Sequence, residues 1–542
     1  MVGSRVYPAP ASRGQALLRA RSLSSGWPFG TDLSLPQAYI PFARRTPCRN
    51  HLLARTIPKD YNPPVTISTY QQALDYLYSF IDYSLQRTYQ YSDHTFDLGR
   101  VHALLALLGD PHRKYAVIHV AGTKGKGSVS AMADSVLRAA GYRTGFYSSP
   151  HLIDFCERIR MGGEPIAHER LAQIVNDLQA TVAKVPGLTT FEITTAAAFQ
   201  YFAEERAEVV VAEVGLGGRL DATNVVTPQV AVITSLSYDH THLLGNTLAE
   251  IAYEKAGIIK PEIPVVSSPQ EGEAMRVLLD VTRERNAPLT LVGRDWHFAP
   301  RSHDLEGQSF YLWSAREQTL MDEMLDRSGE PQWIPMRYEI PLLGYHQVIN
   351  AVTAIATLVV LKERGWNIPE EAIAKGLRSV HWEGRFQILH RAPLVIVDSA
   401  HNRDSARRLR TALDDYVPGR QVGLLFGASD DKDIAGMLDE LSPRLLRMVA
   451  TRSTHPRAAD PEKIAALARE RGFPAEVQAD PAQALEHALR LTGSDGVLLA
   501  AGSLFVAGAV LNEWPQLSRK IFAEKEQEMG PFGLAFGNQR LI

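Results

Sequence analysis

Cysteine, charge imbalance and long apolar runs are all scarce in this chain of 542 residues. Cys48 and Cys156 are its only cysteines, too few for the disulfide framework of a secreted protein, so we expect a reducing, cytoplasmic compartment. The formal net charge is −3, so the chain lacks the basic excess typical of proteins that bind nucleic acid. No apolar run approaches membrane-spanning length, and we therefore expect no membrane partner.

Acidic residues are scarce in one segment, the first 60 residues. Asp32 and Asp60 are the only acids there, whereas arginine recurs throughout. An organellar transit peptide has this kind of composition, which leaves an organellar location as the alternative. The stretch "QALLRARSL" gives only a short amphipathic segment, so a disordered extension or a start codon placed too early is the simpler interpretation. We assign residues 1–64 to an extension.

The rest of the chain is long enough for two hydrophobic cores. Hydrophobic residues make up 45% and charged residues 22% of the sequence, as in ordinary globular proteins. After a first helical segment, short apolar strands alternate with polar or glycine-rich loops and helices. The strands are "YAVIHV", "TGFYSS", "VVVAEV", "QVAVITSL" and "IPVVSS". This alternation predicts a mostly parallel sheet with helices on both faces.

A second, smaller alternating set contains "PLVIVD", "QVGLLFGA", "LLRMVATRS" and "DGVLLAAGS". It predicts a Rossmann-like α/β domain. The predicted fold class is therefore α/β with two domains, the first of P-loop type. The predicted boundaries are 65–380 for the N-terminal domain, 381–392 for a hinge, 393–520 for the C-terminal domain and 521–542 for a tail. Between 295 and 340 the alternation weakens, and we expect strands and loops of a side sheet there.

The stretch "AGTKGKGSVSAM", residues 121–132, is close to a nucleotide-binding P-loop but breaks the usual spacing, because Gly127 stands between Lys126 and Ser128. It still lies between a predicted strand and a predicted helix. Backbone N–H groups freed by glycines and aimed by the first turn of a helix attract phosphate. Lys126 can reach phosphate as a point charge. Ser128 is expected to cap the helix, contact phosphate or bind Mg²⁺.

Polar residues follow the carboxyl ends of several predicted strands, where ligands bind in open parallel sheets. They are Ser149, Glu213, Asp239, His240, Asp398 and His401. A single polar residue there is commonly a cap or a core residue, but these four strand ends, with the glycine-rich loop as a fifth, favour one shared nucleotide and metal site. Glu213 suits Mg²⁺, which prefers carboxylate and phosphate oxygens. The next loop, "GLGGRLDATNVV", is compatible with a tight turn closed by an Arg219–Asp221 pair.

Lys255 falls on the apolar face of a predicted helix that begins with a Thr247–Glu250 capping box and stops near Gly257. A lysine in this place either extends its amine to water or is partly buried, where it can be neutralised or modified. Helical spacing alone favours the first alternative.

Taken in order, these segments resemble the folylpolyglutamate synthases and bifunctional dihydrofolate synthases of the Mur ligase superfamily. The resemblance runs from about residue 68 to 515 and rests on "HVAGTKGKGS", "SSPHLIDFCERIRMGGEPI", "TTFEITTAAAFQYF", "AEVGLGGRLDATNVV", "ITSLSYDHTHLLGNTLAEIAYEKAGIIKP", "LLGYHQVINA", "WEGRFQIL" and "VDSAHNRDSA". It identifies Gly-Thr-Lys-Gly-Lys-Gly-Ser as similar to this family's own P-loop variant. In "DSAHN" the chain departs from the pattern, with Ser399 where many relatives have Gly.

The resemblance implies a role for each matched position. Lys126 and Ser128 would hold ATP phosphates and Mg²⁺, and Lys255 aligns with a lysine that relatives carry as a carbamate. Asn350 would contact the adenine side, and the segment 149–160 would be a loop beside the pterin. The implied sets are Lys126, His240, Lys255, Arg385 and His401 for catalysis; Gly122, Thr123, Lys124, Gly125, Lys126, Gly127, Ser128, Asn350, Arg385 and Asp398 for ATP; Ser128, Ser149, Glu213 and His240 for two Mg²⁺ ions; and Phe191 and Glu192 for the folate.

The implied activity is ATP-dependent addition of L-glutamate to folates through an acyl phosphate, by a monomer. Whether the chain also adds glutamate to dihydropteroate stays open. Another Mur-type ligase, acting on peptidoglycan precursors or a storage polypeptide, would be expected to lack the "SSPHL…ERIR" loop. A non-catalytic nucleotide-binding regulator would be expected to have lost Glu213, His240 or Lys255, and all three are present.

Overall fold

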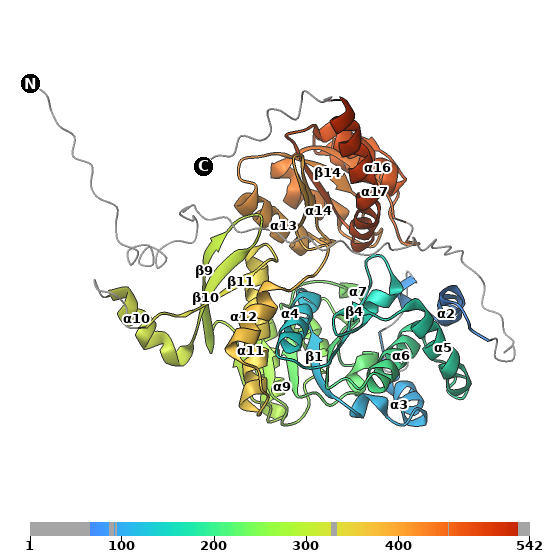
Figure 1. Cartoon of the computed structure of the whole chain (residues 1–542), viewed down its shortest axis with the longest axis vertical. Helices are drawn as coiled ribbons and strands as arrows, with labels where there is room; N and C mark the ends of the chain where they lie inside the picture. Colours follow the sequence, from blue (N-terminus) through green and yellow to red (C-terminus); the bar gives the residue numbers. More distant parts are fainter. Residues whose placement is uncertain (1–65, 86–90, 93–94, 327–332, 454, 529–542) are drawn as a thin grey trace, which may run out of the picture.

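The computed structural model describes residues 66–85, 91–92, 95–326, 333–453 and 455–528. The predicted extension, residues 1–64, lies outside the described residues, and so does Cys48. The described part contains an eight-stranded, a three-stranded and a six-stranded sheet, arranged along the chain in that order (Figure 1).

The eight-stranded sheet has the order β4-β3-β2-β5-β1-β6-β7-β8. All neighbours from β2 to β8 are parallel, and β3 and β4 add an antiparallel edge. Its strands are β1 (Ala116–Ala121), β2 (Thr144–Tyr147), β3 (Ile159–Met161), β4 (Glu164–Pro165), β5 (Val209–Glu213), β6 (Val230–Ile233), β7 (Val265–Ser267) and β8 (Leu289–Leu291).

Both faces of this sheet are buried. On β5, Val210 and Ala212 pack into one apolar cluster and Val209 and Val211 into the cluster on the opposite face, as the two-residue period of a strand requires. The first cluster is built with α2 (Tyr70–Leu77), α3 (Leu98–Leu107), α5 (His168–Val182) and α6 (Thr190–Glu204). The second is built with α4 (Lys126–Ala139), α11 (Tyr345–Glu363) and α12 (Glu370–Arg378). The predicted parallel sheet covered on both faces is therefore confirmed.

The C-terminal sheet has the order β12-β13-β17-β14-β15-β16, parallel except for β12 at its edge. Its strands are β12 (Gln387–Arg391), β13 (Leu394–Val397), β14 (Val422–Phe426), β15 (Leu445–Ala450), β16 (Ala475–Val477) and β17 (Val497–Ala501). Its helices are α13 (Arg403–Tyr416), α14 (Ile434–Leu441), α15 (Pro461–Glu470), α16 (Pro481–Thr492) and α17 (Leu504–Glu528). This arrangement confirms the predicted Rossmann-like unit.

Two details differ from the predicted division of the chain. Strand β12 lies inside the segment 381–392 that was expected to be a hinge, because it pairs with β13 and extends the C-terminal sheet. Helix α17 continues to Glu528, past residue 520, where the tail was expected to begin.

The stretch 295–340 forms the expected side sheet. It consists of three antiparallel strands, β9 (Trp296–His303), β10 (Gln308–Ser314) and β11 (Met336–Ile340), with α10 (Gln318–Asp326) between the last two. In Figure 1 this sheet extends beside α11 and α12 toward α13 of the C-terminal unit.

The expectation that no apolar run approaches membrane-spanning length is wrong for one helix. Helix α11 is long and apolar enough to cross a membrane, although 72% of its apolar stretch is buried inside the protein. It packs against α4 and the eight-stranded sheet, so its apolar composition is accounted for by the core of the fold.

Candidate active site

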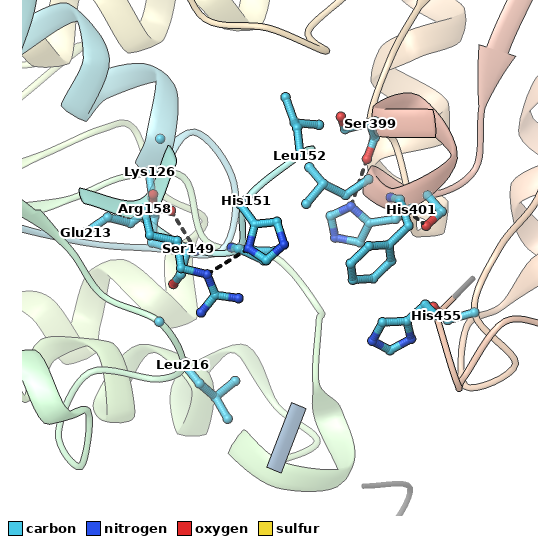
Figure 2. Close-up of a pocket in the computed structure, with 18 of the residues that line it drawn as sticks. Lys126, Ser149, His151, Leu152, Arg158, Glu213, Leu216, Ser399, His401 and His455 are labelled. Carbon is cyan, nitrogen blue, oxygen red and sulfur yellow. Dashed lines mark hydrogen bonds and ion pairs between the residues drawn. The ribbon is translucent and has the colours of Figure 1, made fainter. Parts of the chain in front are cut away.

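A cavity of about 1890 Å³ lies between the two large sheets. On one side it is bounded by the residues that follow β1, β2, β5 and β6, and on the other by the loops after β13, β14, β15 and β17. Figure 2 shows this arrangement, with Lys126, Ser149 and Glu213 on one side and Ser399, His401 and His455 on the other. Every residue that the sequence assigned to a site lines this one cavity.

The glycine-rich loop leads into α4, which begins at Lys126 behind the left-handed Gly125 (φ 90°). The first N–H bond inside the helix runs from Val129 to the Gly125 carbonyl at 2.9 Å. The N–H groups of residues 126–128 therefore have no partner within the helix and face its N-terminal end. Ser128 is the third helical residue and is only 3% exposed. Because Gly125 occupies the cap position, capping is excluded for Ser128, and the phosphate and metal alternatives remain.

Two of the glycines are required by close packing. A side chain at Gly125 would overlap the side-chain amide of Asn350 on α11, and its backbone conformation strains any other residue. A Cβ atom at Gly127 would lie 2.7 Å from the Trp382 ring. The unusual position of Gly127, which breaks the common P-loop spacing, thus lets α4 approach Trp382.

The first part of the loop is attached to the neighbouring strand. The N–H groups of Thr123 and Lys124 both donate to the Ser235 carbonyl, at 3.0 Å each, and the Thr123 hydroxyl donates to the Ser237 carbonyl at 3.1 Å. These two N–H groups are therefore engaged by the protein itself. The groups that remain for a phosphate are those at the start of α4.

Lys124 takes part in a cluster of charges that joins the two sheets. Its ammonium group donates to the Asp239 carboxylate at 2.8 Å and lies 3.2 Å from Nε2 of His401. Lys432 and Asn402, both from the C-terminal unit, also donate to Asp239, at 3.3 and 2.9 Å. Burial opposes ionisation of Asp239, but Lys124 and its other partners hold the pKa of that carboxyl well below its usual range.

His401 is kept neutral by this cluster. The charge of Lys124, followed by burial, lowers the pKa of the imidazole. Nδ1 lies 2.9 Å from the Ser399 carbonyl, which can only accept a hydrogen bond. Nδ1 therefore carries the proton, and Nε2 presents a lone pair toward Lys124 and the cavity.

Glu213, the last residue of β5, is a buried carboxylate beside two cations. Its Oε1 lies 3.8 Å from Nζ of Lys126, and it also accepts a hydrogen bond from the Ser149 backbone. Burial raises its pKa to about 7, although the charges of Lys126 and Arg385 act in the opposite direction. An added cation would favour the ionised form, so the position suits a metal ligand.

His240, whose side chain is 37% exposed, and Lys255, which is buried, are the other titratable groups on this side. Burial lowers the pKa of His240 to about 3, so its ring is neutral and has a nitrogen available to a metal ion. Lys255 is only 5% exposed, so its amine does not extend to water, which was the alternative favoured by helical spacing. Burial, with the charge of Lys126 as the next cause, lowers its pKa to about 7. The helix that carries it, α8 (Leu248–Ala256), has the predicted Thr247–Glu250 capping box and ends at Gly257.

The Arg219–Asp221 pair, which the sequence left as one alternative, is not among the ion pairs of the described residues. Arg219 pairs instead with Glu254 of α8, at 3.0 Å. Asp221 accepts hydrogen bonds from the Thr223 backbone at 3.0 Å and the Leu216 backbone at 2.9 Å, so it orders the loop after β5 by itself. The tertiary partner of Arg219 lies 35 residues away and leaves no signal in the local sequence.

Arg385 and Asp398 come from the connection between the units and from the end of β13. Asp398 accepts hydrogen bonds from the backbone N–H groups of Phe386 at 2.8 Å and Ala400 at 2.7 Å, and this fixes the neighbouring Arg385 beside the cavity.

Asn350 donates a hydrogen bond to Gln347 at 2.9 Å and lies against Gly125. It also lines a second cavity of about 320 Å³, next to the large one, with His346 and Arg408. Ser399 packs its hydroxyl against Gly384.

The two residues assigned to the folate differ in their surroundings. Phe191 lies on the wall of the large cavity, against Gly215. Glu192 also borders it, but its carboxylate accepts the Thr189 backbone N–H at 2.7 Å in the capping box of α6 and pairs with Arg100 at 2.9 Å. The Glu192 side chain therefore has a structural partner on each oxygen.

The loop after β2 bridges the two units. Within it, Arg158 donates to Nδ1 of His151 at 2.9 Å (Figure 2). Leu152 packs into an apolar cluster of the C-terminal unit and lies beside Gly384 and Gly508. This is the segment expected to lie beside the pterin, and its residues line the same cavity as the glycine-rich loop.

Sequence reasoning missed several residues on the C-terminal side of the cavity. Lys432, His455 and Ser503 line it after β14, β15 and β17, and His455 stacks on Phe505 at 4.2 Å. The signal was available, because these residues follow the carboxyl ends of predicted parallel strands in the same way as Asp398.

The comparisons with known proteins agree with this arrangement. Residues 120–358 match the Mur ligase middle domain, and residues 384–504 match the Mur ligase glutamate ligase domain. The dihydrofolate synthase/folylpolyglutamate synthase of Bacillus subtilis is 34% identical over 420 residues, which cover 75% of this chain and 92% of the relative.

Two further comparisons differ in how much of the relative is covered. A probable bifunctional folylpolyglutamate synthase/dihydropteroate synthase of Haloferax volcanii is 33% identical over 450 residues; these cover 82% of this chain but only half, 50%, of the relative. The crystal structure of the bifunctional folylpolyglutamate synthase/dihydrofolate synthase of Yersinia pestis, complexed with AMPPNP and a Mn ion, superposes with a TM-score of 0.69 at 31% identity, covering 84% of this chain and 100% of that one. The chain therefore belongs to the Mur ligase family and, within it, to the folylpolyglutamate synthases and dihydrofolate synthases.

Proposed function

We propose that this protein is an ATP-dependent ligase that adds L-glutamate to folates. The observation that carries the proposal is a single cavity where a phosphate-binding helix N-terminus, a buried carboxylate at Glu213 and cations from both sheets meet. A nucleotide, an anionic acceptor and an amino acid would each find complementary groups there. Relatives and structural neighbours that share the whole arrangement carry the same activity in their names.

ATP would bind with its phosphates at the start of α4. The free N–H groups of residues 126–128 and the positive end of the helix favour phosphate oxygens. Lys126, next to Glu213, supplies a mobile positive charge. Asn350, which borders both cavities, is placed to contact the base on the side of His346 and Arg408.

The chemistry of the donor set fits divalent metal ions. Ser128, Ser149, Glu213 and His240 offer two hydroxyls, one carboxylate and one neutral imidazole around one cavity. Mg²⁺ takes oxygen ligands beside phosphate and water, and neutral imidazole is a common ligand of divalent metals. Two ions would be the expected number. Bound Mg²⁺ would neutralise the charge that develops as the phosphoryl group transfers.

The reaction needs two displacements. An oxygen of the acceptor carboxylate attacks the γ-phosphorus of ATP, and the bond between that phosphorus and the oxygen that bridges to the β-phosphate breaks. ADP departs, and the acceptor now carries an acyl phosphate. The amine of L-glutamate then attacks the acyl carbon, loses a proton and displaces inorganic phosphate to form the amide. Lys126 and Arg385, both beside Glu213, are positioned to offset the negative charge during transfer.

The C-terminal residues would position glutamate and receive a proton. Lys432 and Ser503 offer a cation and a hydroxyl to the carboxylates of the amino acid. Neutral His401, whose Nε2 lone pair faces Lys124 and the cavity, can accept the proton that the attacking amine loses once that contact is given up. Leu152 and the C-terminal loops line the cavity together, and closure of the two units over it would keep water away from the acyl phosphate.

Lys255 is proposed to act as a carbamate. With a pKa near 7, a large share of this amine is neutral at physiological pH and can add CO₂, releasing one proton. The product is a carboxylate-like anion in a cavity wall that also contains Lys124 and Lys126. It would orient the metal ligands nearby. One chain supplies all of these residues, so a monomer is sufficient for activity.

The test is incorporation of labelled L-glutamate in the presence of ATP and Mg²⁺, with tetrahydrofolate and 7,8-dihydropteroate as parallel acceptors. We expect incorporation into tetrahydrofolate. Incorporation into dihydropteroate as well would establish a bifunctional enzyme. If neither acceptor is extended, the folate assignment is wrong and other Mur-type acceptors must be tried.

A further inference from the structure

The side sheet of residues 295–340 has no part in the proposed chemistry, yet it makes a specific contact with the C-terminal unit. The loop between β9 and β10 places Leu305 against the apolar cluster that contains Phe386 and Leu409. Next to it, Glu306 forms an ion pair with Arg391 of β12. The hairpin thus joins the C-terminal sheet at a point separate from the chain connection at 381–392.

Tyr416, the last residue of α13, is at the centre of this contact. Its hydroxyl donates to Oε1 of Gln308 on β10 at 3.1 Å and accepts the N–H of Gly344 at 3.1 Å. Its ring lies 4.8 Å from that of His303 and 5.6 Å from that of Phe386. One side chain therefore contacts the side sheet, the start of α11 and the connecting segment.

Gln308 completes the network. It is 8% exposed, and its amide group donates to the carbonyls of Leu342 at 2.6 Å and Gly344 at 2.9 Å. Gly344 has a φ of 103° and stands directly before α11. Side-chain groups of Gln308 and Tyr416 thus satisfy both the N–H and the carbonyl of this residue, and fix where α11 begins.

Both branches of the network lead to the active site. Along α11, the first two turns carry His346, Gln347 and Asn350, which border the nucleotide side of the cavity. Along the connecting segment, Phe386 has a left-handed backbone (φ 43°), an uncommon conformation for a bulky residue that must be held by its surroundings. Its neighbour is Arg385, and its N–H is bound by Asp398.

We propose that Tyr416 is a positioning residue: with Gln308 and Gly344 it forms a second joint between the two units, which sets the orientation of the C-terminal loops over the phosphate-binding helix. The purpose of the side sheet is to supply this joint. The inference goes beyond the proposed function, but its effect on turnover rests on that function.

The test uses Tyr416→Phe, which removes the hydroxyl and keeps the ring between His303 and Phe386. The matched control is Tyr142→Phe, whose hydroxyl accepts one backbone N–H, from Asn367 at 3.0 Å, within the N-terminal unit. Nitroxide labels on Asp280→Cys in α9 (Gly272–Glu284) and Lys463→Cys in α15, both exposed, report the distance between the units. Cys48 and Cys156 are replaced by serine in every chain.

We expect Tyr416→Phe to broaden or shift the distance distribution and to lower kcat for glutamate addition by about tenfold to a hundredfold, the order of loss that a misplacement of about 1 Å causes. Affinity for ADP should change by less than kcat does, because the phosphate-binding loop is intact and only the base-side residues of α11 depend on the network. Tyr142→Phe should change neither the distances nor kcat. An unchanged distribution and kcat in Tyr416→Phe, or equal losses in Tyr142→Phe, would overturn the inference. If the wild type adds no glutamate, the proposed function fails, and the distance measurement still decides on the joint.

Discussion

Replacing Lys126 by alanine is expected to lower kcat for ATP-dependent glutamate addition by about a hundredfold to a thousandfold, as removal of one charge-stabilising group does in other enzymes. Lys126 is the first residue of α4, and its Nζ lies 3.8 Å from Oε1 of Glu213. Its loss removes the positive charge at the point of phosphoryl transfer. It also leaves the buried Glu213 carboxyl with less compensation, which raises the pKa of that group further and weakens it as a metal ligand.

The measurement is steady-state kinetics with ATP and L-glutamate varied separately, together with thermal unfolding. Lys114→Ala is the control, since Lys114 is exposed and precedes β1. It should retain the wild-type rate. Retention of more than about a tenth of the rate by Lys126→Ala would show that the loop does not place its lysine on the transferring phosphate.

Replacing Lys255 by alanine is expected to cause the second large loss of activity. We expect a loss of about a hundredfold or more in kcat, of the same order as removal of an outer-shell partner in metal sites. The amine pKa is lowered from 10.5 to about 7, so the neutral form needed to add CO₂ increases as pH rises through 7 and is scarce below pH 6. Carbamate formation, and with it activity, should therefore increase over the same range.

Carbon-13 NMR of the protein in labelled bicarbonate measures the modification directly. The wild type should show one carbamate carbonyl signal that Lys255→Ala lacks. Lys260→Ala is a matched control, because Lys260 is also partly buried with a pKa lowered to about 8, but donates to the Asn224 carbonyl. Lys260→Ala should keep the signal. A wild-type spectrum without it, combined with full activity in Lys255→Ala, would remove the carbamate from the mechanism.

Much of the site could be predicted from the sequence because its residues follow strands. The carboxyl ends of parallel strands converge on one edge of a sheet, so Ser149 and Glu213 could be brought together without coordinates, and Asp398 could be placed at the corresponding edge of the second sheet. The same rule would have found Lys432 and His455. The capping box of α8 was equally local, since Thr247 and Glu250 are three residues apart.

What could not be predicted depends on contacts between distant residues. Lys124 contacts His401, 277 positions away, and nothing near either residue indicates that pair. The position of Gly127 becomes intelligible only when Trp382 is seen against it. Helical periodicity places Lys255 on an apolar helix face. It does not describe the surrounding residues that bury the amine. Similarly, β12 is a strand only because β13 offers it an edge.

The central claim is that glutamate is added through an acyl phosphate formed at this cavity, and oxygen transfer tests it most directly. The acceptor folate is labelled with oxygen-18 in both oxygens of the reacting carboxylate, and the inorganic phosphate released with ATP, Mg²⁺ and L-glutamate is analysed by mass spectrometry. We predict one labelled oxygen in each phosphate formed, with ADP as the other product. Unlabelled phosphate accompanied by amide product, or label recovered in AMP, would contradict the account.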